Sequence, residues 1–133
     1  MPRIVLDTNV IVSAVISEGN PRRLLQKGIE KEFTILTSDL ILKELTTVLR
    51  KPKFNTSEDE IRRIIVGLLG ASEVVEVVSR FKAIRDDPND NAILNTAHDG
   101  RADMIVTGDK HLLMLKNFKG TNILSVSEAM QQL

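Results

Sequence analysis

A single carboxylate stands between two apolar runs near the start of this chain. Residues 4–6 are Ile, Val and Leu, Asp7 follows at once, and apolar residues resume at positions 10–12. The β-branched and aliphatic run predicts a buried strand over residues 3–6. Burying an unpaired charge is costly, and open α/β sheets bind ligands at the carboxyl ends of their strands. We therefore expect Asp7 to mark a binding site.

Apolar segments that read as strands alternate with segments that read as helices along the chain. Strands are expected at residues 3–6, 33–36, 74–78, 104–107 and 123–126. Helices are expected up to residue 16 and at 21–29, 38–50, 61–69, 88–100, 110–116 and 127–132, with Thr8 or Asn9 capping the first. This alternation predicts an α/β fold with a parallel sheet covered on both faces. The 133 residues fit a single domain spanning residues 1–133.

Composition excludes several classes of function. Lys plus Arg and Asp plus Glu both number 18, so the chain has no overall basic field to hold nucleic acid. It has no cysteine, which excludes disulfides and thiolate metal sites. No apolar run has the length of a membrane span and no signal peptide opens the chain, so we expect a soluble cytoplasmic protein without membrane contact.

Glu44 is a charged residue within the apolar arc of an expected helix. At about 100° per residue, with Leu40 at zero, Glu44 falls near 40° and Val48 near 80°. No other charged side chain in the body of that helix shares this arc. A core glutamate satisfied by an arginine or a backbone amide is the alternative. The inward position favours a functional acid.

Asp90 lies in the first turn of the helix expected after Pro88. With Asp90 at zero, Leu94 falls near 40° and Ala97 near 340°, so the carboxylate shares the buried stripe. An acid in the first turn of a helix also interacts favourably with the helix dipole, and this is the alternative explanation for Asp90. Capping does not explain why the side chain faces inward. We interpret Asp87 as the N-cap, with a place at the edge of the same site as the alternative.

Asp109 follows the fourth expected strand as Asp7 follows the first. An ordinary N-cap for the next helix is the alternative. Carboxylates that converge repel one another, and a divalent cation relieves the repulsion. Hard oxygen ligands suit Mg²⁺ or Mn²⁺ rather than Zn²⁺. The two histidines, His98 and His111, lack zinc-site spacing, and we expect them at the surface or at helix ends.

Taken in order, these motifs resemble the four acidic motifs of PIN-domain nucleases. The matching residues are Ile-Val-Leu-Asp-Thr-Asn at 4–9, Glu44, Asp-Pro-Asn-Asp-Asn-Ala-Ile-Leu at 87–94, and Thr-Gly-Asp at 107–109. The likeness covers nearly the whole chain and is nearest to the branch described as toxins of toxin–antitoxin pairs. It implies a three-layer α/β/α sandwich with a five-stranded parallel sheet of order 3-2-1-4-5. That order would set Asp7 beside Asp109, with Glu44 and Asp90 closing over them.

The resemblance also implies an activity, which is metal-dependent endoribonuclease cleavage of RNA phosphodiesters. It implies that one or two Mg²⁺ or Mn²⁺ ions are held, directly or through water, by Asp7, Glu44, Asp90 and Asp109. Asn9 and Thr107 would orient ligands or a water. An antitoxin protein and a second copy of the chain are the further partners it implies. Candidate phosphate contacts are Lys43, Lys110, Arg22 and Arg23.

Three rival classes use related arrangements. A haloacid-dehalogenase-type phosphatase needs a second aspartate two residues after the first, where this chain has Asn9. A response-regulator receiver needs an acid at the end of strand three, where this chain has Ser79-Arg80-Phe81. A non-catalytic RNA-binding or scaffold module with a metal-binding acidic pocket stays open as the alternative.

Overall fold

The computed structural model describes residues 1–85 and 87–133. Asp86 lies outside the described residues. The elements follow one another as β1 (Arg3–Leu6), α1 (Thr8–Ile16), α2 (Asn20–Ile29), β2 (Thr34–Thr37), α3 (Asp39–Leu49), the 3₁₀ turn η1 (Pro52–Phe54), α4 (Glu58–Ala71), β3 (Ser72–Val74), α5 (Pro88–Asp99), β4 (Met104–Val106), α6 (Lys110–Leu115), β5 (Asn117–Phe118), β6 (Thr121–Leu124) and α7 (Val126–Gln132). The expected alternation of strands and helices is therefore confirmed. Within the described residues, no helix has the length and apolar character needed to cross a bilayer.

The sheet has the strand order β3-β2-β1-β4-β6-β5. The strands β3, β2, β1, β4 and β6 pair in parallel. Because β6 is the fifth strand that the sequence predicts, this confirms the expected order 3-2-1-4-5. The short strand β5 was not expected, and it pairs antiparallel with β6 at the edge of the sheet. The turn between them places Gly120 at φ 93°, a conformation that glycine adopts readily. Two residues are too few for an apolar pattern to reveal such a strand.

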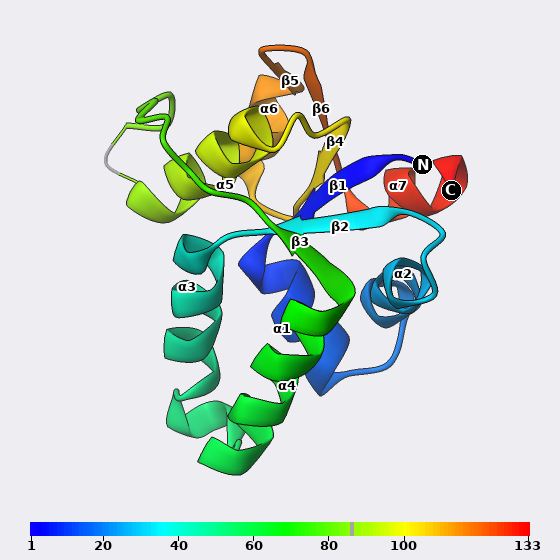
Figure 1. The fold of residues 1–133 in the computed structure, drawn as a ribbon, viewed down its shortest axis with the longest axis vertical. Helices are drawn as coiled ribbons and strands as arrows, with labels where there is room; N and C mark the ends of the chain where they lie inside the picture. The colour runs from blue at the N-terminus through cyan, green and yellow to red at the C-terminus, as the bar shows by residue number, and fades with distance from the viewer. Residues whose placement is uncertain (86) are drawn as a thin grey trace.

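Helices cover both faces of the sheet, and β1 lies at its centre. Figure 1 views the sheet nearly edge-on, with α1 to α4 on one side and α5 and α6 on the other. Ile4, Val5 and Leu6 are at most 1% exposed, as a central parallel strand requires. Helices α3 and α5 contact each other across the end of the sheet where β1 and β2 finish. The carboxyl ends of the central strands are therefore enclosed by helices from both layers.

Strand β3 ends four residues earlier than the valine-rich run predicts. It covers Ser72–Val74, and Val75 adds one last backbone bond to Thr37. The chain then leaves the sheet and runs along α5, where side chains of that helix bond its backbone at Val78, Ser79, Phe81 and Ile84. Polar partners on α5 thus take over from the strand pairing that the sequence predicts.

The helical wheel of α3 is only partly confirmed. Ile41, Leu45 and Leu49 are at most 1% exposed, but Leu40, assigned to the apolar arc, is 47% exposed. The buried face therefore begins at Ile41, and Glu44 lies at its edge with a half-buried side chain. A wheel drawn from sequence cannot detect this because it does not define where the neighbouring elements end.

Gly28 provides a test of how closely α2 packs on β2. A Cβ at this position would lie 2.5 Å from Cγ1 of Ile35 and 2.9 Å from Cζ of Phe33. Overpacking of this kind costs about 1–3 kcal/mol, so Gly28→Ala should lower the free energy of unfolding by that amount in urea denaturation. Gly67→Ala on α4 is the control, because no described residue outside the adjoining helix turns comes within 4 Å of a Cβ added there and the higher helix propensity of alanine should stabilise. Equal stabilisation by both variants would contradict this packing.

Candidate metal centre

Asp7 is buried at the point where β1 ends and α1 begins. Its side chain is the N-cap of α1 and accepts from the backbone N–H of Asn9 at 3.3 Å. Thr8 and Asn9, expected as the cap, are instead the first residues of the helix. The residue is 6% exposed, and burial raises the pKa of its carboxyl, an effect that the hydrogen bond from Thr107 opposes.

Thr107 joins the ends of the two central strands. Its hydroxyl donates to Oδ2 of Asp7 at 2.5 Å and accepts from the backbone N–H of Asp109 at 3.0 Å. The strand register places it there, because Leu6 pairs with Val106 and the next residues on β1 and β4 come side by side. Thr107 is fully buried, so this link lies away from water. It fits the orienting role that the resemblance implies.

Asp90 is the acid whose environment is least favourable to its charge. It is 7% exposed in the first turn of α5, and its Oδ2 accepts no hydrogen bond from any described residue. Burial, followed by the charges of Asp109, Asp87 and Asp7, raises the pKa of Asp90 to about 7. Asp87 caps α5 by accepting from the backbone N–H of Asp90 at 3.0 Å, which confirms its interpretation as the cap.

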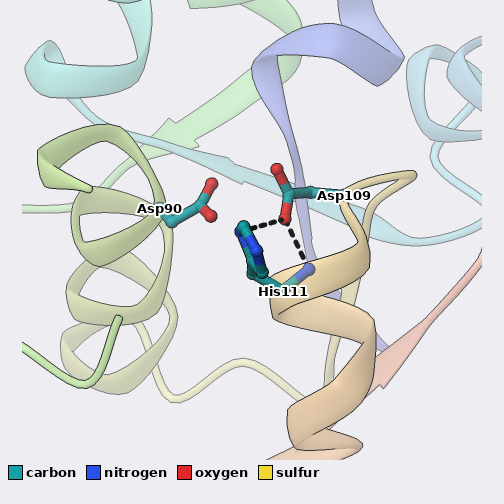
Figure 2. A group of neighbouring side chains, drawn as sticks. All are labelled: Asp90, Asp109 and His111. Carbon is teal, nitrogen blue, oxygen red and sulfur yellow. Dashed lines mark hydrogen bonds and ion pairs between the residues drawn. The ribbon is translucent and has the colours of Figure 1, made fainter. Parts of the chain in front are cut away.

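Asp109 and His111 face Asp90 from the start of α6. One ligand atom each from Asp90, Asp109 and His111 lie within 4.8 Å of one another. Figure 2 shows the Asp90 side chain reaching from α5 toward the other two. Asp109 also caps α6, because its Oδ1 accepts from the backbone N–H of His111 at 2.8 Å and of Leu112 at 3.3 Å. Its capping and site readings are therefore compatible.

His111 is the member of this group that the sequence did not single out. It is exposed in the first turn of α6, as expected for a histidine at a helix end, and Nδ1 lies 3.9 Å from Oδ1 of Asp109. A histidine two residues after a strand-end acid is the available signal, and by itself it is weak. His98 is also exposed and lies in the last turn of α5.

Glu44 and Asn9 are not joined to this group by a described contact. Glu44 lies on α3 with its side chain half-buried, and Asn9 is exposed in the first turn of α1. Neither side chain makes a hydrogen bond or ion pair with a described residue. Their assignment to the site stays a prediction. Among the candidate phosphate contacts, Arg22 is engaged elsewhere, because it donates to the carbonyls of Ala14 and Val15 at 2.9 and 3.0 Å.

The residues present fit a divalent cation. Two carboxylates lie within reach of one ion, and a buried carboxylate oxygen of Asp90 lacks a partner among the described residues. Asp7 adds a third negative charge that is felt at Asp90. Oxygen donors of this kind prefer Mg²⁺ or Mn²⁺, whereas the imidazole of His111 prefers softer metals. The group can therefore hold a metal ion.

Comparison with known proteins decides the family. The model of the PIN domain family matches residues 3–111, which is most of the chain and spans Asp7, Asp90 and Asp109. The chain belongs to the PIN-domain family. This PIN domain is 33% identical over 119 residues to "Uncharacterized protein MJ1680" of Methanocaldococcus jannaschii, a match that covers 86% of this chain and 76% of the relative.

Solved structures share the fold of this PIN domain at low identity. VapBC2 from Rickettsia felis, bound to a promoter DNA fragment, has a TM-score of 0.66 at 18% identity, covering 92% of this chain and 98% of that chain. DNA-bound VapBC from Salmonella typhimurium has a TM-score of 0.64 at 18% identity, covering 95% and 99% of the two chains. PAE2754 from Pyrobaculum aerophilum has a TM-score of 0.63 at 18% identity, covering 98% and 88%. These likenesses support the fold.

The metal-free PIN domain should become more stable when Asp90 loses its charge. Folding raises the pKa of Asp90 from 3.8 to about 7, so the folded state binds its proton more tightly than the unfolded state. This destabilisation is absent below pH ~4, grows as the pH rises to ~7 and is constant above. Asp90→Asn should therefore raise the free energy of unfolding at pH 8 by about 1–3 kcal/mol and leave it nearly unchanged at pH 4.

Urea denaturation in EDTA at both pH values measures the effect. Asp59→Asn is the control, because Asp59 lies exposed on α4 in a surface ion pair with Arg62 at 3.5 Å. Such a pair contributes little, so the control should show no comparable gain at pH 8. A loss of stability in Asp90→Asn at pH 8 would contradict the assignment of Asp90 as a charge held at an energetic cost.

Proposed function

We propose that this PIN domain is a metal-dependent endoribonuclease that hydrolyses RNA phosphodiester bonds. The observation that carries the proposal is the buried carboxylate of Asp90, which lies beside Asp109, has a raised pKa and has one oxygen without a hydrogen-bond partner among the described residues. PIN domains are generally nucleases, and the family supports this chemistry for the site. A further support is that Asp7 and Asp109 follow the carboxyl ends of the paired strands β1 and β4, where α/β folds bind ligands.

The chain's own residues would hold the cation through oxygen atoms that are still free. Oδ1 of Asp109 caps α6, which leaves Oδ2 available, and Oδ2 of Asp90 is likewise unengaged among the described residues. The hydroxyl of Thr107 and the backbone N–H of Asn9 both donate to Asp7, so its carboxylate group is held in one orientation. Glu44 is proposed as the fourth ligand from α3. Bound Mg²⁺ or Mn²⁺ supplies Lewis-acid activation of water and stabilises charge on the phosphate that is cleaved.

Cleavage should depend on these acids and on the cation. Asp7→Asn and Asp90→Asn should each lower the rate of RNA cleavage in Mg²⁺ or Mn²⁺ by more than the roughly 10–100-fold that loss of an outer-shell partner costs. Asp59→Asn should retain the native rate, and EDTA should abolish it. The measurement is gel analysis of a labelled RNA, with products that carry 5′-phosphate and 3′-hydroxyl ends.

Three outcomes would contradict this function. Activity that persists in EDTA, or is equal in the native chain and both site variants, would rule out a metal nuclease. If Mn²⁺ raises the melting temperature of the native chain but no RNA is cut, the non-catalytic RNA-binding or scaffold module with a metal-binding pocket is the better description.

We infer that the partner of this chain is an antitoxin protein. The support is the fold shared with VapBC assemblies from Rickettsia felis and Salmonella typhimurium. Co-expression with the product of the adjacent gene should yield a complex that co-purifies and in which RNA cleavage is suppressed. Light scattering on the chain alone would test the homodimer that the resemblance implies. Full cleavage in the presence of every adjacent gene product would contradict the antitoxin inference.

A further inference from the structure

Three polar side chains at spacings of four residues form a clamp along one face of α5. Asn91 accepts from the N–H of Ile84 at 2.9 Å and donates to its carbonyl at 2.7 Å. Asn95 does the same with Phe81, at 2.9 and 3.2 Å. Asp99 accepts from the N–H groups of Val78 and Ser79 at 2.7 and 2.8 Å, and from the hydroxyl of Ser79. We call the residues held in this way, 78–84, the clamped segment.

The clamp fixes which side chains of this segment face solvent. Phe81 is half-buried, with its ring centroid 5.0 Å from that of His98 and 5.6 Å from that of Phe118. Arg80 and Lys82, on either side of it, are exposed and make no ion pair with a described residue. Four bonded backbone positions and the contacts of one aromatic ring thus hold Arg80 and Lys82, which have no ion-pair partner among the described residues, in a defined place.

A groove of about 490 Å³ lies between the clamped segment, the start of α5 and Leu40 of α3. Its lining includes the cations Arg80 and Lys82, the apolar side chains of Leu40, Pro88 and Ala92, and Asp87. One of them, Asp87, accepts a hydrogen bond from the N–H of Asp90. The groove therefore begins within one helical turn of the acidic centre.

The chemistry of the groove matches a single-stranded nucleic acid. Arg80 and Lys82 have no ion-pair partner among the described residues and outnumber the one carboxylate of the lining, Asp87, so the groove carries positive charge that the acidic centre and the neutral chain as a whole do not. Leu40, Pro88 and Ala92 add apolar surface against which a base can pack, and because such apolar contact is non-directional it does not distinguish one base from another. The amides of Asn91 and Asn95 bond the protein backbone, so they position the segment instead of reading base edges.

We propose that this groove is a subsite for the single-stranded RNA that leads to the acidic centre, with Arg80 and Lys82 as its phosphate contacts. The proposal rests on the proposed function for the identity of the strand. Asn91, Asn95 and Asp99 are positioning residues that act through the clamped segment. Affinity along this path is electrostatic and largely independent of sequence.

Binding can be measured separately from cleavage in the Asp90→Asn background. The probe is a fluorescein-labelled 12-nucleotide oligouridine, followed by anisotropy in Mg²⁺ over a range of salt concentrations. Adding Arg80→Ala and Lys82→Ala should raise the Kd about tenfold at low salt. It should also reduce the slope of log K against log salt by about 1.4, since each single-strand phosphate contact contributes about 0.7.

The matched control is Lys51→Ala with Arg63→Ala, which removes the same charge from exposed positions outside the groove. It should leave both Kd and slope nearly unchanged. Equal effects of the two double variants, no effect of either, or no oligouridine binding at all would overturn the subsite. Competition by a 12-residue polyglutamate peptide as strong as by unlabelled oligouridine would also overturn it, because the surface would then accept any polyanion.

The outcome is distinguishable from a failure of the nuclease assignment. In a chain with Asp90 intact, Arg80→Ala with Lys82→Ala should lower kcat/KM about tenfold and change kcat by less than about twofold. A chain that cuts no RNA but binds oligouridine through Arg80 and Lys82 would remove the nuclease function and retain the subsite. A chain that cuts RNA equally well with and without these cations would retain the nuclease function and remove the subsite.

Discussion

The hydrogen bond from Thr107 to Asp7 joins the two central strands at the point where negative charge is buried. Parallel pairing of β1 with β4 brings these residues together, and the same threonine hydroxyl accepts from the backbone of Asp109. One uncharged side chain therefore orients two acids. Helix α5, on the face of the sheet away from α1, then adds Asp90. The buried Oδ2 of Asp90 has no hydrogen-bond partner among the described residues. The metal-free fold holds this arrangement against its own electrostatic repulsion, so a cation that bound there would stabilise the fold.

The strand-end acids could be predicted because the physical argument needed only local information. An aspartate directly after a buried apolar run, at Asp7 and again near Asp109, has few explanations when the sheet is parallel. Asp90 could be predicted because its helix is long enough to define an inward face, and the structure confirms that burial. The resemblance to PIN domains supplied the strand order, which no local pattern contains and which the sheet confirms.

The features that could not be predicted depend on competition between distant parts of the chain. The valines after Val74 have strong strand propensity, yet Asn91, Asn95 and Asp99 draw the following backbone onto α5. Leu40 belongs to the apolar arc that the sequence predicts for α3, but it is exposed because the elements that pack against α3 do not cover it. His111 joins the acidic group only because α6 begins where α5 presents Asp90. In each case, the decisive partner is far away in the sequence.

The clamp on α5 holds its segment almost entirely through main-chain atoms. Substitutions at Arg80 or Lys82 therefore leave the anchoring bonds of Phe81 and Ile84 in place. The outward-facing residues of the clamped segment can therefore be substituted one at a time, while the carboxylates one helical turn away keep their geometry. The strength of polyanion binding at the clamped segment can therefore change while the acidic centre keeps its arrangement.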